Sequence, residues 1–162
     1  MEGTTWRSMM GKFATGVTVI TTLDEEGQPI GMTANAFTSL SLEPSLLIIC
    51  LDKGSSTLVS LLATRKFTVN FLADTQEDLS RCFARKSETD KFAEIDYREG
   101  KLGLPILGGC LASVECSLAD TLDGGDHLIL VGQGEFLYES ATQLSPLLFY
   151  QGKYRALQAL EV

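Results

Sequence analysis

The sequence predicts a mainly β fold, in which an antiparallel sheet closes on itself and a few short helices lie at its joints. Six or so segments have the length and apolar content of strands, and the short helical segments do not alternate regularly with them. No G-x-G-x-x-G motif follows a strand, so a Rossmann site is not expected. We expect a single domain over residues 1–162, because this length supports one full core and is too short for separate cofactor and substrate domains.

The first third of the chain predicts a helix, a hairpin and a buried strand. Four apolar residues recur at helical spacing, and we expect this stripe to enter the core: Trp6, Met9, Met10 and Phe13. The β-branched run 17–22 turns at residues 26–27 and returns through Ile30 as a hairpin. The continuous apolar run 46–51 is typical of a strand covered on both faces.

Two helices and a strand are predicted in the middle of the chain. Residues 54–57 open the first helix, whose apolar positions should face inward: Leu58, Leu61 and Leu62. A strand with alternating apolar residues covers 67–71. Asp74 then caps a second helix in a reciprocal capping box with Glu77. The buried stripe of that helix is expected to contain Leu79, Cys82 and Phe83.

The remaining residues predict a surface excursion and three more strands. Residues 81–101 are densely charged, with few apolar anchors: Phe92, Ile95 and Tyr97. Strands are expected at 111–118 and 127–138, and two glycines of the second strand favour a bulge or bend: Gly132 and Gly134. A last short strand covers 149–154, and the tail 156–162 favours a helix.

The charge balance excludes several classes of partner. The chain carries 21 acidic residues against 13 Lys and Arg, a net charge of −8, which argues against binding to nucleic acid or an anionic membrane. No apolar run reaches the ~20 residues of a membrane span, and residues 1–12 lack the layout of a secretion signal. We therefore expect a cytoplasmic protein without a membrane segment.

The cysteines do not predict a metal site. They show no C-x-x-C spacing, and His127 is the only histidine that could join them. Cys110 and Cys116 fall on one face of a strand, and Cys50 lies within an apolar run. We interpret all of the cysteines, Cys82 included, as structural thiols.

The most informative segment is the run of small or uncharged residues from Gly31 to Ser41. Small side chains let a flat ligand approach main-chain N–H groups, and the segment adds uncharged hydrogen-bonding partners: Thr33, Asn35, Thr38 and Ser39. Such a surface suits a neutral heteroaromatic ring better than a phosphate or a metal. Phe37 could either stack on that ring or plug the core.

This segment resembles the flavin-ring-binding segment of the short-chain flavin reductases, the reductase partners of two-component flavin monooxygenases. Three further motifs resemble that family in the family's order: F-A-T-G-V-T-V at 13–19, G-D-H at 125–127 and P-L-L-F-Y-Q-G-K-Y-R at 146–155. Together they span nearly the whole chain. The resemblance implies a split Greek-key β-barrel that forms a homodimer, with the flavin near the subunit interface.

A phosphate seat is predicted where the first internal helix begins, at Lys53–Thr57. Free N–H groups and the helix dipole attract anions there, although Ser55 or Ser56 could simply cap the helix. Positive charge at 81–86 could serve the phosphate or only the helix dipole; the resemblance favours a role for Arg85 and Lys86. The predicted flavin site comprises Met32, Thr33, Ala34, Asn35, Ala36, Phe37, Thr38, Ser39, Cys50, Leu51, Asp52, Ser55, Ser56, Thr57, Phe83, Ala84, Arg85, Lys86 and Tyr150.

A nicotinamide nucleotide site is predicted from two other segments. The resemblance implies that His127 helps to hold the nucleotide; by itself it could be an ordinary polar group at the start of a strand. The closing segment combines cations and aromatic rings suited to a dinucleotide, with Lys153 and Tyr154 assigned to the site. The alternative is a terminal strand whose cations, Lys153 and Arg155, are solvated.

The resulting hypothesis is an NAD(P)H-dependent flavin reductase that transfers a hydride from NADH or NADPH to FMN or FAD and supplies a separate monooxygenase. Positioning supplies the rate, so no catalytic side chain and no metal is assigned. One alternative is an electron-transfer flavoprotein that binds FMN tightly without nicotinamide turnover. Another is a flavin or pyridoxal-phosphate storage module; the few basic residues outside 81–101 argue against the pyridoxal-phosphate version.

Overall fold

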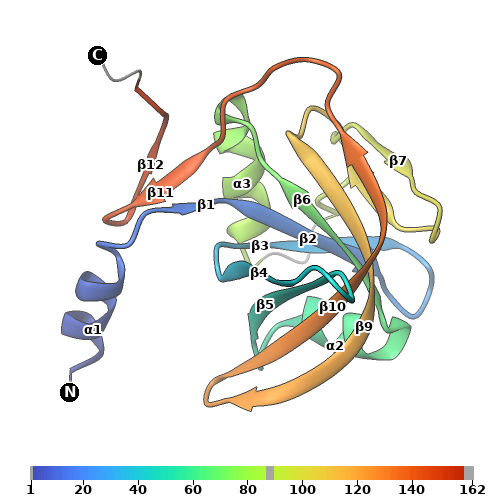
Figure 1. Ribbon diagram of the computed structural model, residues 1–162, viewed down its shortest axis with the longest axis horizontal. Helices are drawn as coiled ribbons and strands as arrows, with labels where there is room; N and C mark the ends of the chain where they lie inside the picture. The colour runs from blue at the N-terminus through green and yellow to red at the C-terminus, as the bar shows by residue number, and fades with distance from the viewer. Residues whose placement is uncertain (1, 87–89, 159–162) are drawn as a thin grey trace.

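The computed structural model describes residues 2–86 and 90–158 and shows strands arranged around a barrel, with short helices at its ends (Figure 1). The helices are α1 (Gly3–Met10), α2 (Ser56–Thr64), the 3₁₀ turn η1 (Asp74–Gln76) and α3 (Glu77–Ala84). The strands are β1 (Thr15–Gly16), β2 (Thr18–Leu23), β3 (Pro29–Ala34), β4 (Phe37–Ser41), β5 (Leu46–Asp52), β6 (Lys66–Phe71), β7 (Tyr97–Glu99), β8 (Pro105–Leu107), β9 (Ala112–Gly124), β10 (His127–Glu139), β11 (Leu148–Tyr150) and β12 (Lys153–Arg155).

Seven strands form the main sheet in the order β3-β2-β6-β9-β10-β5-β4, and every ladder is antiparallel. The two edge strands, β3 and β4, follow one another in the chain and are joined only by Asn35 and Ala36. So short a connection requires the sheet to curl until its first and last strands lie close together. They do not pair, so the barrel is split at that seam. The predicted fold class is confirmed.

Two apolar clusters hold this arrangement. One fills the barrel and is closed at one end by α2, whose Leu58 and Leu61 are buried. The second lies between the barrel and α3 and includes Val19, Phe83 and Phe92. Phe92 comes from the charged segment 81–101, which confirms that this excursion is anchored by an apolar side chain.

The glycines of β10 allow the bulges predicted there. The β9–β10 register shifts between Val131 and Gly132 and again between Gly134 and Phe136. A Cβ at Gly132 would collide with the ring of Phe67, so the small residue also admits that ring into the core. Strand β9 continues past its predicted end at 118 as far as Gly124, whereas β10 matches its prediction to within one residue, and the two form a long hairpin with its tip at 124–127.

The expected burial of the N-terminal stripe is wrong for this chain. Helix α1 forms, but none of its residues is buried, and the stripe is exposed: Trp6 54%, Met9 54%, Met10 48% and Phe13 79%. The helix stands beside a separate sheet of order β1-β11-β12, away from the barrel (Figure 1). Among the described residues, the two apolar clusters of the barrel are complete without any residue of the stripe.

Other local expectations are also corrected. The predicted capping box of Asp74 and Glu77 does not form, because the chain makes a 3₁₀ turn first and no side chain caps α3. Instead, Oε1 of Gln76 accepts from the N–H of Ala73 at 2.9 Å, before that turn. Leu62 is exposed, because the inward face of α2 is already filled. Alternate residues of β5 are only half-buried, so the strand, Cys50 included, is fully covered on one face only.

The C-terminal region also differs from its prediction. The single last strand is a hairpin, β11–β12, that turns at Gln151 and Gly152, where both residues have positive φ. Residues 156–158 form no helix, and the rest of the predicted tail helix, 159–162, lies outside the described residues. Cys82 is half-buried, whereas Cys110 and Cys116 are buried as expected.

Candidate functional site

The small-residue segment, residues 31–41, forms the two edges of the split in the barrel, which we call its lips. Residues 31–34 end β3, residues 37–41 form β4, and Asn35–Ala36 cross between them, so the segment is mostly strand rather than loop. In the described part of the chain β3 pairs only with β2, which leaves its outer edge without a neighbouring strand. Free edge groups beside small side chains provide the hydrogen-bonding surface that the sequence predicts.

The side chains of this segment face different surroundings. Asn35, Ala36, Thr38 and Ser39 are exposed, Met32 and Thr33 are half-buried, and Ala34 is buried. The Phe37 ring packs edge-on against Phe71 with centroids 5.0 Å apart and joins the barrel core, which favours the core-plug interpretation of this residue. Close packing requires a glycine at position 31, because a Cβ there would lie 2.7 Å from the carbonyl oxygen of Ile20.

Helix α2 begins beside these lips and carries no side-chain cap. Ser55 has the extended backbone of an N-cap residue, yet its hydroxyl donates to the sulfur of Met32 at 3.1 Å instead of accepting from the helix. The first turn holds no acidic residue. Its N–H groups therefore keep both their hydrogen-bonding capacity and the positive end of the helix dipole.

The end of β5 leads directly into this helix. Asp52 is exposed, and its Oδ1 accepts from the N–H of Gly54 at 2.6 Å, which fixes the turn before α2. Cys50 lies next to the lips, because its N–H donates to the carbonyl oxygen of Ala36 at 3.0 Å. Leu51 and Thr57 are buried, so neither side chain is exposed to a ligand at the seam.

Helix α3 covers the other side of β3. The hydroxyl of Thr33 donates to the carbonyl oxygen of Ser80 at 2.6 Å. Phe83 is 1% exposed and its ring lies against Gly31, so it belongs to the core, whereas the next three residues are exposed: Ala84, Arg85 and Lys86. Arg81 is held in an ion pair of 2.6 Å with Glu77 and is less available to a phosphate than Arg85 or Lys86.

Histidine 127 starts β10 directly opposite Asp52, beside the turn that precedes α2. Its Nδ1 lies 2.7 Å from Oδ1 of Asp126, and this hydrogen bond lowers the pKa of the Asp126 carboxyl. The backbone N–H of Lys53 also bonds to Asp126, at 3.0 Å, while the Lys53 side chain pairs with Asp123 at the hairpin tip. The structure thus brings His127 to the α2 side of the seam.

The C-terminal candidates lie on the hairpin β11–β12. Lys153 is exposed, and Tyr150 and Tyr154 are half-buried. The hydroxyl of Tyr154 lies 2.7 Å from Oγ of Ser80, which places this hairpin against α3. Sequence reasoning did not single out Ser80; a serine inside the apolar stripe of a helix was the one available signal.

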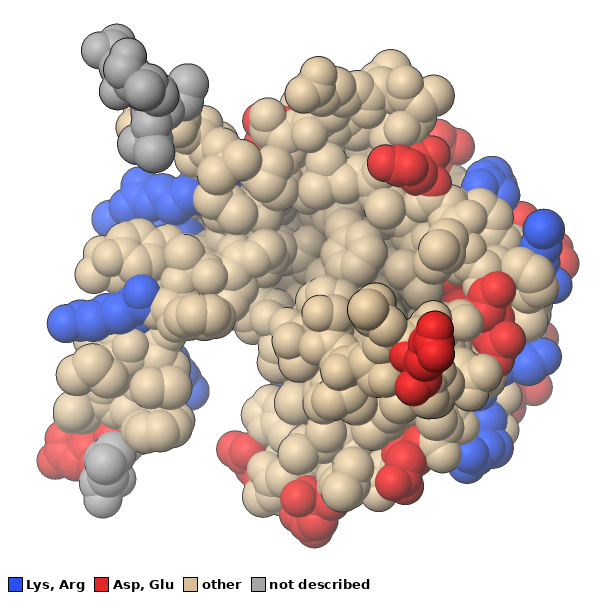
Figure 2. Space-filling view, viewed as in Figure 1, with Lys and Arg blue, Asp and Glu red and all other residues tan. Residues whose placement is uncertain are grey.

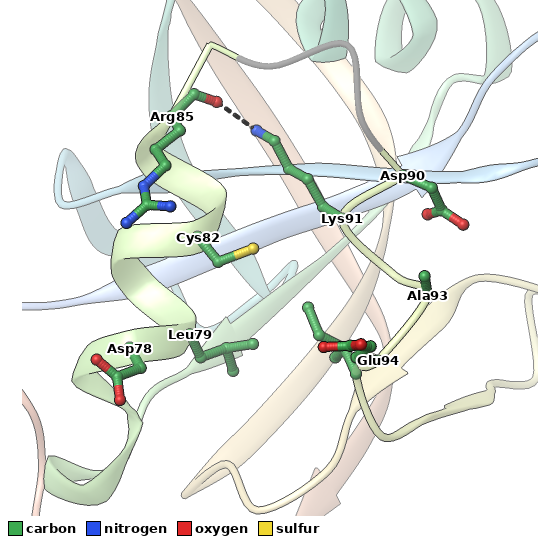
Figure 3. A pocket seen from close by; sticks show the side chains of 9 residues that line it. Asp78, Leu79, Cys82, Arg85, Asp90, Lys91, Ala93 and Glu94 are labelled. Carbon is green, nitrogen blue, oxygen red and sulfur yellow. Dashed lines mark hydrogen bonds between the residues drawn. The ribbon is translucent and has the colours of Figure 1, made fainter.

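A cavity of about 550 Å³ lies beside the site but on another face of α3 (Figure 3). It opens between α3 and residues 90–95, and Figure 3 shows Lys91 reaching across it to the backbone of Arg85, an interaction of 2.6 Å. Burial lowers the pKa of Lys91, whose ammonium caps the end of α3. Of the predicted site residues only Arg85 lines this cavity, and the ring-binding lips do not.

The split barrel therefore presents an uncharged strand edge beside an uncapped helix N-terminus, an arrangement that fits a flat ring carrying a phosphate. No group of three or more His, Cys, Asp or Glu within 2–86 and 90–158 could hold a metal ion. These features define a class: nucleotide-type cofactor binders built on a split β-barrel.

Comparison with known proteins identifies the family to which the chain belongs. The model of the family described as "Flavin reductase like domain" matches residues 10–158. The reductase subunit HsaB of a flavin-dependent monooxygenase from Mycobacterium tuberculosis is 44% identical over 155 residues, 95% of this chain and 82% of HsaB. The flavin reductase (NADH) of Kitasatospora aureofaciens is 36% identical over 156 residues, 95% of this chain and 81% of that protein.

A solved structure gives the same result. The NADH:FAD oxidoreductase SgcE6 of Streptomyces globisporus, in complex with NAD and FAD fragments, superposes with a TM-score of 0.90 at 36% identity and covers 96% of this chain and 92% of SgcE6. The chain belongs to the flavin reductase family, which confirms the resemblance seen in its motifs. It is an NAD(P)H:flavin oxidoreductase, which transfers a hydride from a nicotinamide nucleotide to a flavin.

Proposed function

We propose that this chain reduces FMN or FAD with NADH or NADPH at the seam of the split barrel and releases the reduced flavin to a separate monooxygenase component. The observation that carries the proposal is the uncapped start of α2, joined to the small-residue lip through the Ser55–Met32 contact of 3.1 Å. A match to a monooxygenase reductase subunit along 95% of the chain supports the choice of partner.

The flavin ring is assigned to the lips of the seam. The outer edge of β3 and the exposed residues after it offer N–H groups and short polar side chains without a fixed charge, notably Thr33, Asn35 and Thr38. Bound there, a flavin supplies the hydride acceptor of the reaction. The lips hold and orient it, and neutral donors aimed at its pyrimidine edge favour the negative charge gained on reduction.

The flavin phosphate is assigned to the start of α2. Backbone N–H groups of Ser56 and Thr57 and the helix dipole attract an anion, and no carboxylate of the first turn opposes it. Arg85 and Lys86 at the end of α3 are exposed and supply further positive charge. This division matches the chemistry of the ligand, with a neutral surface for the ring and a positive one for the phosphate.

The nicotinamide nucleotide is assigned to the two segments that carry His127, Lys153 and Tyr154. In one chain these residues belong to two separate parts, the tip of β9–β10 and the hairpin β11–β12 (Figure 1). We infer that a homodimer brings the two parts of different subunits together. Figure 2 supports this inference, because an open notch separates α1 from the barrel.

The α1 stripe is the expected dimer contact. Trp6, Met9, Met10 and Phe13 each expose about half or more of their surface, and a polar solvent-facing helix would not place four large apolar side chains together. We expect Met9→Glu to dissociate the dimer in sedimentation experiments and to lower turnover. A matched change on the same helix, Ser8→Glu, tests whether added charge alone has this effect. A monomeric wild-type protein with full activity would refute the dimer.

No helix among the described residues is long and apolar enough to cross a membrane. We propose a cytoplasmic location, because the co-substrate is a nicotinamide nucleotide and the four cysteines are free thiols. We also propose that residues 1–162 act as one flavin reductase-like unit, since the ring lips, the α2 start and both nicotinamide segments belong to one fold.

The direct test is oxidation of NADH or NADPH by the purified protein in the presence of excess FMN or FAD. We expect turnover well above a buffer blank, and titration with each flavin and each nucleotide identifies the preferred pair. If neither nucleotide is oxidised while FMN binds tightly, the protein is instead an electron carrier. Absorbance of the purified protein distinguishes a resident flavin from one that is released after each turnover.

A further inference from the structure

Helix α3 connects the flavin-ring lip to the hairpin that carries the nicotinamide residues. Ser80, at its centre, is fully buried. Its carbonyl oxygen accepts from Oγ1 of Thr33 at 2.6 Å, and its hydroxyl lies 2.7 Å from the hydroxyl of Tyr154. One residue therefore contacts β3 through its backbone and β12 through its side chain.

The residue after Ser80, Arg81, also contacts Tyr154. The guanidinium carbon of Arg81 lies 4.8 Å from the centre of the Tyr154 ring, and Nε and Nη2 of Arg81 donate to Oε1 of Glu77, at 2.9 and 2.6 Å. Phe149 packs edge-on against the Tyr154 ring, with centroids 5.3 Å apart. Contacts within the chain thus occupy the Tyr154 hydroxyl and cover its ring with a cation.

Backbone pairing within the described residues holds β11 more firmly than β12: β11 pairs with β1, at Thr15–Phe149 and Gly16–Leu148, whereas β12, which carries Tyr154, pairs with β11 alone. The entry of the hairpin is fixed by the Ala73–Pro146 bridge and by the Leu147 N–H, which donates to Leu72 at 3.0 Å. At its turn, Gln151 bonds to Gly11, which belongs to the outlying lobe and not to the barrel. Within the described ranges, Ser80–Tyr154 is the one side-chain hydrogen bond made by β11 or β12.

We propose that Ser80 is a positioning residue that holds the β11–β12 hairpin at the place where it receives the nicotinamide nucleotide. Tyr154 then serves as the anchor of the hairpin rather than as a stacking partner of the nucleotide, and Lys153 is the residue of the hairpin that remains to contact the nucleotide. The inference rests on the proposed function. Losing the anchor leaves the flavin lips intact but adds an ordering cost to nucleotide binding, because a freer hairpin must be fixed on association.

The test uses Ser80→Ala and Tyr154→Phe in the full-length chain, each of which removes one hydroxyl. We expect either change to raise KM for NADH by roughly two- to tenfold, as befits one buried hydrogen bond, with the flavin Kd within about twofold of wild type. The double variant should be no worse than the more affected single variant, because both remove the same interaction. Amide hydrogen exchange in 148–155 should accelerate in each variant.

Ser113→Ala is the matched control. Ser113, in β9, is also a buried serine, 3% exposed. Its hydroxyl donates to Oδ1 of Asn70 in β6, at 2.8 Å, and forms no hydrogen bond with the β11–β12 hairpin. The Ser113→Ala variant should have a lower melting temperature than wild type and an unchanged KM for NADH. If Ser80→Ala and Tyr154→Phe also lower only the melting temperature, Ser80 is merely structural and the proposal is overturned.

The outcome is separable from that of the proposed function. Wild-type protein that oxidises neither nucleotide refutes the reductase assignment, whatever the variants do. Wild-type protein that turns over normally, with variants whose KM and hydrogen exchange match those of the control, refutes the role of Ser80 alone.

Discussion

Two helices start beside the barrel, and their first turns differ in charge. No side chain caps either helix by a hydrogen bond. At α3, acidic residues in the first turn and in the 3₁₀ turn before it oppose the positive end of the dipole: Asp74, Glu77 and Asp78. At α2, the Ser55 hydroxyl donates to Met32, and the first turn has no acidic residue. The positive end of the α2 dipole is therefore left to an anionic ligand, which separates a structural helix from a binding helix.

The sharpest way to break this contrast is to cap α2. Ser55→Asp places a carboxylate at the N-cap, where it competes for the N–H groups and repels a phosphate. We expect the flavin Kd to rise at least about 100-fold, because charge-assisted hydrogen bonds are lost. The free energy of unfolding should stay constant or rise by about 0.3–1 kcal/mol through the helix dipole. Fluorescence titration and thermal melting measure the two effects.

An uncharged comparison separates repulsion from capping. Ser55→Asn also accepts from the helix N–H groups but carries no charge, so its loss of flavin affinity should be smaller. An unchanged Kd in Ser55→Asp would show that the phosphate binds elsewhere.

Removing the Gln76 side chain, which fixes the 3₁₀ turn before α3, tests the other half of the contrast. Gln76→Ala deletes the bond to the Ala73 N–H and the bond from Nε2 to the carbonyl oxygen of Gly108, which is 2.8 Å long. We expect a loss of about 1–3 kcal/mol in the free energy of unfolding, measured with urea, and no change in the flavin Kd. Thr75→Ala, at an exposed neighbour, is the control. A weakened flavin affinity at full stability would contradict a purely structural α3 start.

His127 extends the contrast to the second substrate, because it lies on the α2 side of the seam. We expect His127→Ala to raise KM for the nicotinamide nucleotide by roughly three- to tenfold and to leave flavin affinity nearly unchanged. Steady-state kinetics with varied nucleotide measure this directly. An unchanged KM would withdraw His127 from the site and leave it as a polar residue at a strand start.

The smallest expected effect concerns the thiols. Burial raises the pKa of Cys110 to about 11 and that of Cys116 to about 12, so both remain protonated and unreactive at pH 8. Cys50 and Cys82 are half-buried, and burial also raises the pKa of Cys50. Alkylation of the folded protein at pH 8 should modify at most two thiols, Cys82 first, and all four in denaturant. Rapid labelling of Cys116 would contradict the closed core.

The starts of these two helices also show which features of a helix end can be predicted from its sequence. The motif at 74–77 predicts a capped helix, and the helix exists, but no side chain caps it, because the chain first makes a 3₁₀ turn in which Gln76 bonds to the N–H of Ala73. Ser55 has the right residue type for a cap, and only its contact with Met32 shows that it does not act as one. Residue type limits what a helix end can do; neighbours from distant strands decide what it does.

The α1 stripe likewise shows that a local pattern predicts an element but not its neighbours. Its spacing predicts a helix correctly, because periodicity is a local property. Its burial was predicted wrongly within the chain, because periodicity identifies an apolar face without identifying what covers it. The barrel core closes without α1, and the proposed partner is a second copy.

By itself, the sequence determined the barrel strands β2, β5, β6, β9 and β10, the bulge glycines of β10, the uncharged segment 31–39 and the family, since alternation, glycine and short motifs are encoded within a few residues. Only the tertiary structure showed that the lip is a strand edge at a seam, that α2 starts uncapped beside it, and that Ser80 links Thr33 to Tyr154. Those contacts join residues 23 to 74 positions apart, and they exist only because the sheet curls until its two ends meet.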